Sequence, residues 1–407
     1  MAGPLSHIKV LDLSRVLAAP WTGQNLADLG AEVIKLERPK SGDDSRAFGP
    51  PWLKDQNGND TTESAYFLSA NRGKKSVTVN LSKPEGQKIV RELAAQCDVL
   101  LENYKFGNLA RYGLGCEDLK KINPRLIYCS VTGFGQTGPY RDRPGYDFMI
   151  QGMGGLMSIT GERDDLPGGG PQRVGIPIAD IMTGMYATIA VCAALAHRER
   201  TGASQHLDLA LLDTQVAVLA NQGMNYLATG EVPRRIGNAH PNIVPYQPFK
   251  TRDGDIILAC GNDNQFGKFC EAADCRHLAQ DARFATNAKR VENRAQLVPL
   301  LAGIFLKRTT REWVGMLEAA GVPNGPINNL EQVFEEPQVV ARGMKIELDH
   351  PLAGKLPLVA SPMRFSATPL EHKAPPPMLG QHTEEILRGL LKMGDADIAR
   401  LRADGVI

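Results

Sequence analysis

Hydrophobic residues in the first half of the chain follow two alternating patterns. Short runs rich in Val, Ile and Leu predict strands at 8–13, 31–37, 75–81, 98–104 and 125–134. Amphipathic segments between some of these runs predict helices at 20–29 and 84–96. Strands that alternate with helices are typical of βαβ units with a parallel sheet. The pattern therefore predicts an α/β fold whose ligand lies beyond the carboxyl ends of the strands.

The pattern changes in the second half of the chain. A long apolar helix is predicted after Asp180 and ends near 197–202, and a second helix is predicted at 210–230. A loop-rich stretch follows at 231–254. Because 407 residues exceed what one hydrophobic core usually supports, we expect two domains. The large domain is expected in 1–200, a linker helix in 201–225, a small domain in 226–320, and a linker with a C-terminal part in 321–407.

Composition narrows the class of protein. The 46 Lys and Arg residues nearly balance the 45 Asp and Glu residues, so no global charge attracts nucleic acid or an acidic membrane. We expect neither as a partner. The seven scattered cysteines, and the lack of an export signal or a long uninterrupted apolar run, predict a cytoplasmic protein with reduced cysteines.

Several common active-site motifs are missing. The first predicted strand leads into its helix without GxGxxG, which argues against a dinucleotide cofactor. No GxSxG, HExxH or GxxxxGK[ST] motif occurs, and the eight histidines show no metal-ligand spacing. The common hydrolase, zinc and P-loop classes are therefore excluded, and no metal site is expected.

Basic residues gather just after the predicted strands. They are Arg38, Lys40, Arg46, Arg72, Lys74, Lys75, Lys105 and Arg111. The carboxyl ends of parallel strands meet at one edge of a sheet, so these cations suit a phosphate-rich nucleotide. A solvated rim would show the same charges, and the charge pattern alone leaves both interpretations open.

Asp180 lies between two apolar runs, 175–179 and 185–196, where a carboxylate is costly to bury without a purpose. One interpretation is a helix N-cap, which stabilises a helix by about 1 kcal/mol. The other is an oxygen nucleophile that attacks an activated acyl carbon and forms a covalent intermediate. Position alone leaves both interpretations open.

Five motifs together carry a family resemblance. They read VLDLSRVLAAPWTGQNLADLGAEVIKLERPKSGDDSR, SANRGKKSVTVNL, DVLLENYKFGNLARYGL, YCSVTGFGQTGPYRDRPGYD and VGIPIADIMTGMYA. With these motifs in order, the chain resembles the family III CoA-transferases from about residue 5 almost to its end. The resemblance implies a Rossmann-like large domain built from both termini, a smaller middle α+β domain, and a homodimer of two interlocked chains.

The resemblance also implies the chemistry. Asp180 would be the nucleophile that carries CoA between two acids through anhydride and aspartyl-CoA thioester intermediates. Acyl-CoA and a carboxylic acid would be the substrates, with no tightly bound cofactor. The residues implied along the CoA path are Val16, Ala18, Arg38, Lys74, Lys75, Asn103, Tyr104, Arg111 and Tyr146.

The choice within the superfamily depends on two regions. Racemases of this superfamily have a histidine where this chain has Tyr146, and a phenol with a pKa near 10 is a poor proton shuttle. Stretches at 14–20, 49–52, 237–254 and 321–339 resemble the members that move CoA between C4–C6 dicarboxylates such as succinate and glutarate. Candidates for binding the distal carboxylate are Arg235, His240, Asn242 and Tyr246. A 2-methylacyl-CoA racemase and a catalytically silent CoA-binding protein are the alternatives.

Overall fold

The computed structural model describes residues 3–407, which form two compact units. The larger unit contains the chain up to Leu156, Val174–Met224 and Pro337–Ile407. The smaller unit contains Met157–Arg173 and Asn225–Glu336. Each unit is thus assembled from separate parts of the chain. The smaller unit takes in 157–173 and 321–336 in addition to the 226–320 range expected from the sequence.

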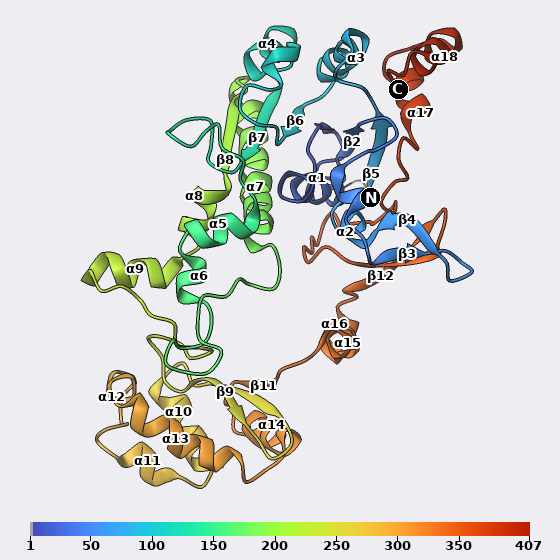
Figure 1. The fold of residues 1–407 in the computed structure, drawn as a ribbon. Helices are drawn as coiled ribbons and strands as arrows, with labels where there is room; N and C mark the ends of the chain where they lie inside the picture. The colour runs from blue at the N-terminus through green and yellow to red at the C-terminus, as the bar shows by residue number, and fades with distance from the viewer. Residues whose placement is uncertain (1–2) are drawn as a thin grey trace. The chain divides into compact units, whose positions relative to one another are not determined.

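A six-stranded parallel sheet organises the described part of the larger unit (Figure 1). Its strands are β1 Lys9–Asp12, β2 Glu32–Glu37, β5 Lys74–Thr78, β6 Val99–Glu102, β7 Ile127–Thr132 and β8 His206–Ala210. The spatial order is β5-β2-β1-β6-β7-β8, and every neighbouring pair is parallel. This is the doubly wound order, in which the chain changes direction between β1 and β6. A ligand crevice is expected at that point.

Both faces of the sheet are buried, because successive side chains on a strand point to opposite faces. On β1, Val10 belongs to one hydrophobic cluster and Leu11 to the other. On β2, Val33 and Ile34 divide in the same way. All four side chains are almost fully buried. The continuous apolar runs that predicted these strands are the signature of a sheet covered on both sides.

Helices from distant parts of the sequence cover the two faces. One face packs against α1 (Ala18–Asp28) and α7 (Ile178–Thr201). The other packs against α3 (Pro84–Ala94) and the C-terminal α17 (Thr383–Gly389) and α18 (Asp395–Ala403). The remaining elements of the larger unit are β3 Trp52–Lys54, β4 Asp60–Ser64, α2 Ala65–Ser69, α4 Cys116–Ile122, α5 Asp147–Met153, α8 Leu211–Ala217, α16 Pro337–Ala341, β12 Lys345–His350 and β13 Gly354–Val359, with short 3-10 turns η1 Asp44–Ala47 and η2 Ala110–Tyr112.

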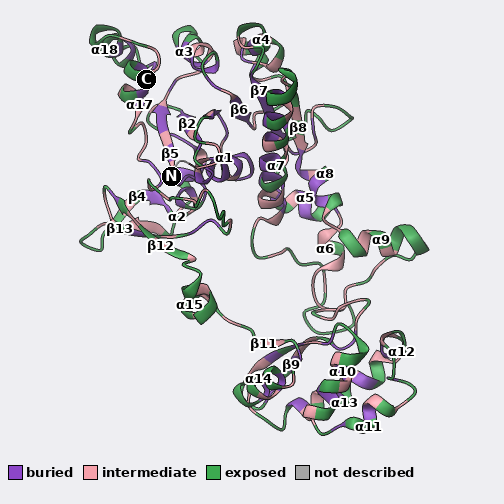
Figure 2. Ribbon diagram, turned by 180° about the vertical axis from the view of Figure 1, so that it is seen from behind, coloured by how far each residue is buried: buried purple, intermediate pink, exposed green. Residues whose placement is uncertain are grey.

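The helix α7 is the longest apolar helix among the described residues, and by length and composition it could cross a membrane. In the fold it packs on the sheet: Ala179, Ala187, Val191 and Leu195 lie in the core. Figure 2 shows the buried stripe of α7 beside β7 and β8. The helix ends at Thr201, where Gly202 adopts a left-handed conformation.

The segment after α7 differs from the sequence prediction. Residues 206–210 form the edge strand β8, and the helix predicted at 210–230 is two helices, α8 and α9 (Ala220–Thr229). The break falls at Ala220, which has φ of 46°. Residues 201–225 are thus not a simple linker helix. The alternating HLDLA sequence of β8 is too short and too polar to stand out as a strand.

The smaller unit has its own core. Antiparallel strands β9 Tyr246–Lys250, β10 Asp255–Ala259 and β11 Asn324–Pro326 form its sheet. Phe249 and Phe305 stack at 4.8 Å between ring centroids, and Trp313 packs on Phe305 at the same distance. Its helices are α10 Asp263–Ala272, α11 Arg276–Gln280, α12 Asn287–Glu292, α13 Arg294–Phe305, α14 Thr310–Ala319 and α15 Leu330–Glu335; α6 Leu156–Ile159 and α9 lie where the chain passes between the units.

Candidate active site

A cavity of about 210 Å³ opens in the larger unit at the carboxyl ends of β1, β6 and β7. It is lined by 15–18 after β1, by 103–106 after β6, by 131–133 at the end of β7, by Arg141 and 143–146, and by Asp44, Asp180 and Leu211. This is the place where the strand order reverses, and it is where open α/β sheets bind their ligands. The expectation of a ligand site beyond the strand ends agrees with this geometry.

Asp180 lies in the first turn of α7 and contributes to the cavity wall. It does not cap the helix. The buried carboxylate of Asp147 does so instead: its Oδ1 accepts the N–H of Ala179 at 2.8 Å and that of Asp180 at 3.4 Å. The N-cap interpretation of Asp180 is therefore wrong. Because Asp147 satisfies the helix start, the Asp180 carboxylate is not needed for that role.

Asp147 is itself held in place. Its Oδ2 accepts a hydrogen bond from Nε2 of the fully buried Gln151 at 2.7 Å. The Oε1 of Gln151 accepts the N–H of Val174 at 2.9 Å, just before α7 begins. These contacts join the starts of α5 and α7. Sequence reasoning missed this role of Asp147, although the residue ends the quoted GYD motif.

Burial and a like charge both raise the pKa of Asp180, to about 7, with burial as the larger cause and Asp147 as the second. The carboxyl is therefore divided between its acid and its nucleophilic form near neutral pH. The same charges act on Tyr66 of α2. Burial, and after it the charges of Asp180 and Asp147, raise the pKa of Tyr66 to about 12. Tyr66 therefore keeps its proton at neutral pH.

Close backbone packing fixes the walls around Asp180. A Cβ on Gly184, one turn after Asp180, would lie 2.5 Å from the carbonyl oxygen of Ala18. The hydroxyl of Thr22 donates to the carbonyl of Gly184 at 3.1 Å. Only glycine allows α1 and α7 to approach this closely, so the start of α1 and the turn that carries Asp180 are locked together.

A second pair of glycines positions the loop at 143–146. A Cβ on Gly133 would lie 2.5 Å from the Cα of Gly145, and a Cβ on Gly145 would lie 2.3 Å from the Cα of Gly133. The loop therefore crosses directly over the end of β7. This contact places Arg143 and Tyr146 on the cavity wall immediately before Asp147.

Four cationic side chains line the cavity: Arg15, Lys105, Arg141 and Arg143. Arg15 pairs with Asp44 at 2.9 Å, and Arg141 pairs weakly with its neighbour Asp142 at 3.6 Å.

Arg143 stacks on the ring of Tyr140 at 4.5 Å and forms no ion pair with any residue between 3 and 407. An exposed guanidinium without an acidic partner suits a phosphate or a carboxylate of a ligand. Among these four cations, only Lys105 belonged to the basic clusters noted in the sequence.

The structure divides the residues expected along the CoA path into two groups. Val16, Ala18, Asn103, Tyr104 and Tyr146 line the cavity with Asp180. Tyr104 lies under the guanidinium of Arg15, whose centre is 4.9 Å from the ring. The side chain of Tyr146 is 70% exposed, which leaves it accessible from the cavity mouth. Arg38, Lys74, Lys75 and Arg111 lie elsewhere.

Lys74 and Lys75 are engaged within the fold. Lys74 is fully buried, and its ammonium contacts Oδ2 of Asp12 at 2.9 Å and the carbonyl of Pro20 at 2.8 Å. A ligand cannot reach it, so its position corrects the expectation from the sequence. Lys75 is shared between Glu32 and Glu385, each at 2.8 Å. Both lysines begin β5, and a strand start lies at the edge opposite the cavity.

Arg38 and Arg111 are exposed but lie outside this cavity. Arg38 pairs with Asp44 and lines an adjoining cavity of about 190 Å³ together with Tyr104. Arg111 lies in the short turn η2. Arg38 therefore remains accessible to a ligand that extends past Tyr104, whereas no described contact links Arg111 to the site.

The four candidates for the distal carboxylate lie in the smaller unit. Arg235 donates to the carbonyl of Ser158 at 3.0 Å and pairs with Asp164, so its charge is already balanced. His240 packs against Tyr246 with ring centroids 5.2 Å apart.

Asn242 belongs to the same cluster, because its N–H donates to Nδ1 of His240 at 3.1 Å. Burial first, and then the charge of Arg294, lower the pKa of His240. His240, Asn242 and Tyr246 thus organise one loop, and Arg235 organises another.

No three His, Cys, Asp or Glu side chains within residues 3–407 gather closely enough to bind a metal ion. The ionisable groups that the described site offers are one cavity-lining carboxylate, its neighbouring carboxylate, and a rim of cations.

The fold and the site together are typical of an α/β enzyme with a cation-rimmed cavity at a topological switch point, beside a helix-borne carboxylate. Comparison with known proteins makes this specific. The chain belongs to CoA-transferase family III, whose profile matches residues 5–383.

Two curated relatives and one solved structure illustrate the similarity. The succinate–glutarate CoA-transferase of Agrobacterium fabrum is 49% identical over 387 residues, which are 95% of this chain and 96% of the relative. The succinyl-CoA:glutarate CoA-transferase of Homo sapiens is 46% identical over 99% of this chain and 90% of the relative. The crystal structure of a CAIB/BAIF family protein from Brucella suis is 51% identical, with a TM-score of 0.83 over 96% of this chain and 100% of that chain.

Proposed function

We propose that this CoA-transferase moves CoA from succinyl-CoA to a C4–C6 dicarboxylate such as glutarate, with Asp180 as the nucleophile. The observation that carries the mechanism is the half-buried carboxylate of Asp180 in the wall of a cation-rimmed cavity at the switch point of the sheet. The choice of acids is supported by the substrates named for the two relatives above.

The reaction is a chain of acyl exchanges in which no water takes part. A carboxylate oxygen of Asp180 attacks the thioester carbon of succinyl-CoA, and the C–S bond breaks. This gives a succinyl-aspartyl anhydride and CoA thiolate. The thiolate attacks the aspartyl carbonyl and expels succinate, which leaves an aspartyl-CoA thioester. Glutarate attacks that carbonyl and releases CoA thiolate, which then attacks the glutaryl carbon and frees Asp180.

The raised pKa of Asp180 fits this role. A carboxylate that is poorly hydrated has less water to lose before it attacks, and a dry site protects the anhydride from hydrolysis. The phenol of Tyr66 stays neutral and so adds no further negative charge near Asp180. Neither group requires a metal or a redox cofactor.

The cations of the cavity would bind the phosphates of CoA. Arg15, Lys105, Arg141 and Arg143 surround the mouth in place of the buried Lys74 and the paired Lys75. Arg38 extends this positive surface along the adjoining cavity. Because charge-assisted hydrogen bonds to phosphate are strong, this rim can hold the nucleotide end while the thioester reaches Asp180.

We also propose that the protein is a homodimer of interlocked chains. The larger unit exposes large apolar side chains on α7 and α8: Tyr186 is 42% exposed, Ile189 is 60% exposed and Val216 is 55% exposed. Exposed apolar side chains on neighbouring helices are typical of subunit interfaces. Light scattering of the purified protein should give twice the mass of one chain, and a monomer would contradict the proposal.

Trapping of the aspartyl thioester tests the mechanism. The protein is mixed with succinyl-CoA and hydroxylamine, and the Asp180 peptide is analysed by mass spectrometry. We expect a hydroxamate on Asp180 and loss of activity in step with its formation. The Asp180→Asn variant is the matched control and should remain unmodified. Normal turnover with an unmodified Asp180 peptide would refute the proposal.

A further inference from the structure

The loop that joins β1 to α1 contains a residue in a strained conformation. Val16 has φ of 71°, in the left-handed region that a β-branched side chain strongly disfavours. Val16, Leu17 and Ala18 line the cavity together with Asp180. The α1 helix that follows has no capping side chain, so its first N–H groups can face a ligand's negative charge. The strained conformation must therefore be held by contacts outside the loop.

Side chains hold the peptide groups of Ser14 and Arg15 at both the N–H and the carbonyl. Oδ1 of Asp12 accepts the N–H of Ser14 at 2.9 Å, and the ammonium of Lys35 donates to the carbonyl of Ser14 at 2.8 Å. Asn103 makes two hydrogen bonds to the backbone of Arg15. Its Oδ1 accepts the Arg15 N–H at 2.9 Å, and its Nδ2 donates to the Arg15 carbonyl at 2.6 Å. The side-chain amide of Asn103 is therefore occupied by the loop.

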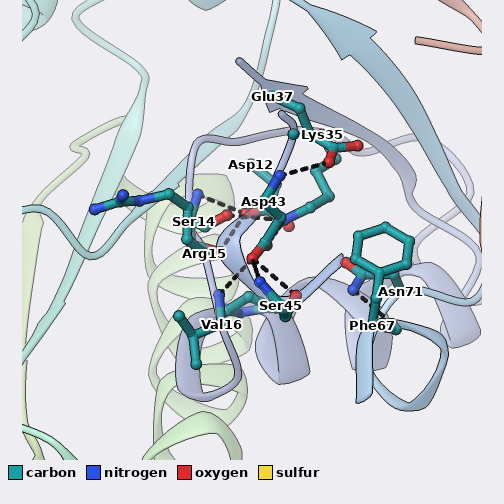
Figure 3. A network of polar contacts seen from close by, with 12 residues as sticks. Asp12, Ser14, Arg15, Val16, Lys35, Glu37, Asp43, Ser45, Phe67 and Asn71 are labelled. Atoms are coloured by element: carbon teal, nitrogen blue, oxygen red, sulfur yellow. Dashed lines mark hydrogen bonds and ion pairs between the residues drawn. The ribbon is translucent and has the colours of Figure 1, made fainter. Parts of the chain in front are cut away.

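The contact to Val16 itself comes from Asp43. Its Oδ1 accepts the N–H of Val16 at 3.0 Å, and its Oδ2 pairs with the ammonium of Lys35 at 2.8 Å (Figure 3). Both charged side chains are fully buried. Oδ1 of Asp43 also accepts the N–H of Ser45 at 2.9 Å. The ammonium of Lys35 therefore contacts both the Ser14 carbonyl and the carboxylate that accepts the Val16 N–H, so one cation holds two neighbouring positions of the loop.

We propose that Lys35 and Asp43 are positioning residues for acyl transfer at Asp180. Neither side chain lines the cavity that contains Asp180; Asp43 lines only the adjoining cavity of Arg38. They act through Val16: the ion pair fixes the acceptor for the Val16 N–H, and this bond keeps the backbone of 16–18 on the cavity wall that Asp180 shares. The inference rests on the proposed function, because the step that it concerns is the one that Asp180 begins.

Two double variants distinguish the effect of the hydrogen-bond acceptor for the Val16 N–H from the effect of the two charges. Lys35→Met with Asp43→Asn removes both charges and retains an oxygen acceptor for the Val16 N–H. Lys35→Met with Asp43→Leu has a similar volume but no acceptor. Neither double variant leaves one buried charge without its partner, the change that most often prevents folding.

The rate of aspartyl-CoA thioester formation is measured in single turnovers well below both unfolding temperatures. We expect the asparagine pair to react about tenfold more slowly than the wild type, because it lacks the ammonium that fixes the acceptor. The leucine pair should react about 100-fold more slowly than the wild type, because it lacks the acceptor as well, and a small misplacement of reacting groups has an effect of that size. Affinity for CoA should change much less than this rate. Equal rates in the two pairs would overturn the inference.

A third change tests whether the effect passes through Val16. Glycine adopts φ near 71° without strain, so adding Val16→Gly to the leucine pair makes the working conformation accessible again. We expect the rate to recover about tenfold, which corresponds to strain at the low end of the usual range. A merely structural role of the ion pair predicts a change in unfolding temperature and no recovery of the rate, and that result would also overturn the inference.

Hydrogen exchange of the wild-type protein covers the case in which the leucine pair does not fold. The Val16 amide should exchange far more slowly than exposed loop amides, because its acceptor is fully buried. Exchange at the rate of an exposed loop amide would refute the role of Asp43. Failure of the proposed function is distinguishable, because the wild-type protein would then form no adduct on Asp180 at all.

Discussion

Asp147 and Asp180 place two carboxylates at the start of one helix, and their interaction should be visible in the pH dependence of catalysis. The change that tests it is Asp147→Asn. The asparagine keeps an oxygen for the N–H of Ala179, so α7 retains its main cap contact. It removes the negative charge that opposes ionisation of Asp180.

The magnitude follows from the causes of the raised pKa. The pKa of Asp180 rises from 3.8 to about 7, and burial contributes more than Asp147 does. Asp147 therefore accounts for less than half of the rise, and Asp147→Asn should lower the pKa of Asp180 by about 1. Burial remains, so the pKa should stay well above that of an exposed aspartate.

The assay is the pH profile of kcat/KM with succinyl-CoA and glutarate. Because the nucleophile is the ionised form, activity should fall as pH drops through about 7 in the wild-type protein. In Asp147→Asn the acidic limb should move about 1 pH unit lower. Asp397→Asn, on the exposed side of α18, removes a comparable charge away from the cavity and serves as the control. An acidic limb that stays in place, or that moves to higher pH, would refute the proposed interaction.

Three further predictions follow from the same geometry. Since the folded-state pKa of Asp180 lies above 3.8, its ionisation lowers stability as pH rises from about 4 to about 7. Asp180→Asn should therefore abolish transfer yet raise the free energy of unfolding by about 2 kcal/mol at pH 8, with no gain near pH 3. A loss of stability at pH 8 would contradict the burial argument. Gly184→Ala should destabilise the protein by about 1–3 kcal/mol in denaturant unfolding because its Cβ has no room, whereas Gly303→Ala, with open space around it, should stabilise by about 0.5–1 kcal/mol; equal effects would contradict the close packing of α1 on α7. Arg143→Gln should raise the KM for succinyl-CoA by about 10–100-fold and weaken its salt dependence, whereas the exposed Arg276→Gln should leave both unchanged, and an unaltered KM in Arg143→Gln would exclude this residue from the anion site.

Much of the fold could be predicted from local patterns. Short runs rich in Val, Ile and Leu identified β1, β2, β6 and β7, because strands of a doubly covered sheet carry hydrophobic residues on both faces, and the β-branched residues of 77–79 identified β5. The edge strand β8 was missed, because its residues alternate and are mostly only partly buried. The break between α8 and α9 was also missed, since no Gly or Pro marks the left-handed Ala220.

The candidate site was predictable where a motif carries the chemistry, and not where charge alone was the guide. Asp180 could be selected because burying a carboxylate between apolar runs is energetically costly unless the carboxylate has a role. Lys74 was wrongly assigned to the CoA path. Its position near a strand does not show at which end of the strand it lies, or whether an acid such as Asp12 already pairs with it. Arg143 gave no signal, because its place on the cavity wall depends on the contact of Gly133 with Gly145.

The amino-acid sequence by itself determined the class of fold and the family, and it singled out Asp180 as the candidate nucleophile, because hydrophobic periodicity and ordered motifs are properties of neighbouring residues. Only the tertiary structure decided which charges face a ligand and which are neutralised in the core. It also decided that Asp147 caps the helix that carries Asp180, and that Asp43 holds Val16 in place. These contacts join residues 27 to 33 positions apart, and their energies depend on burial and distance, which no local pattern records.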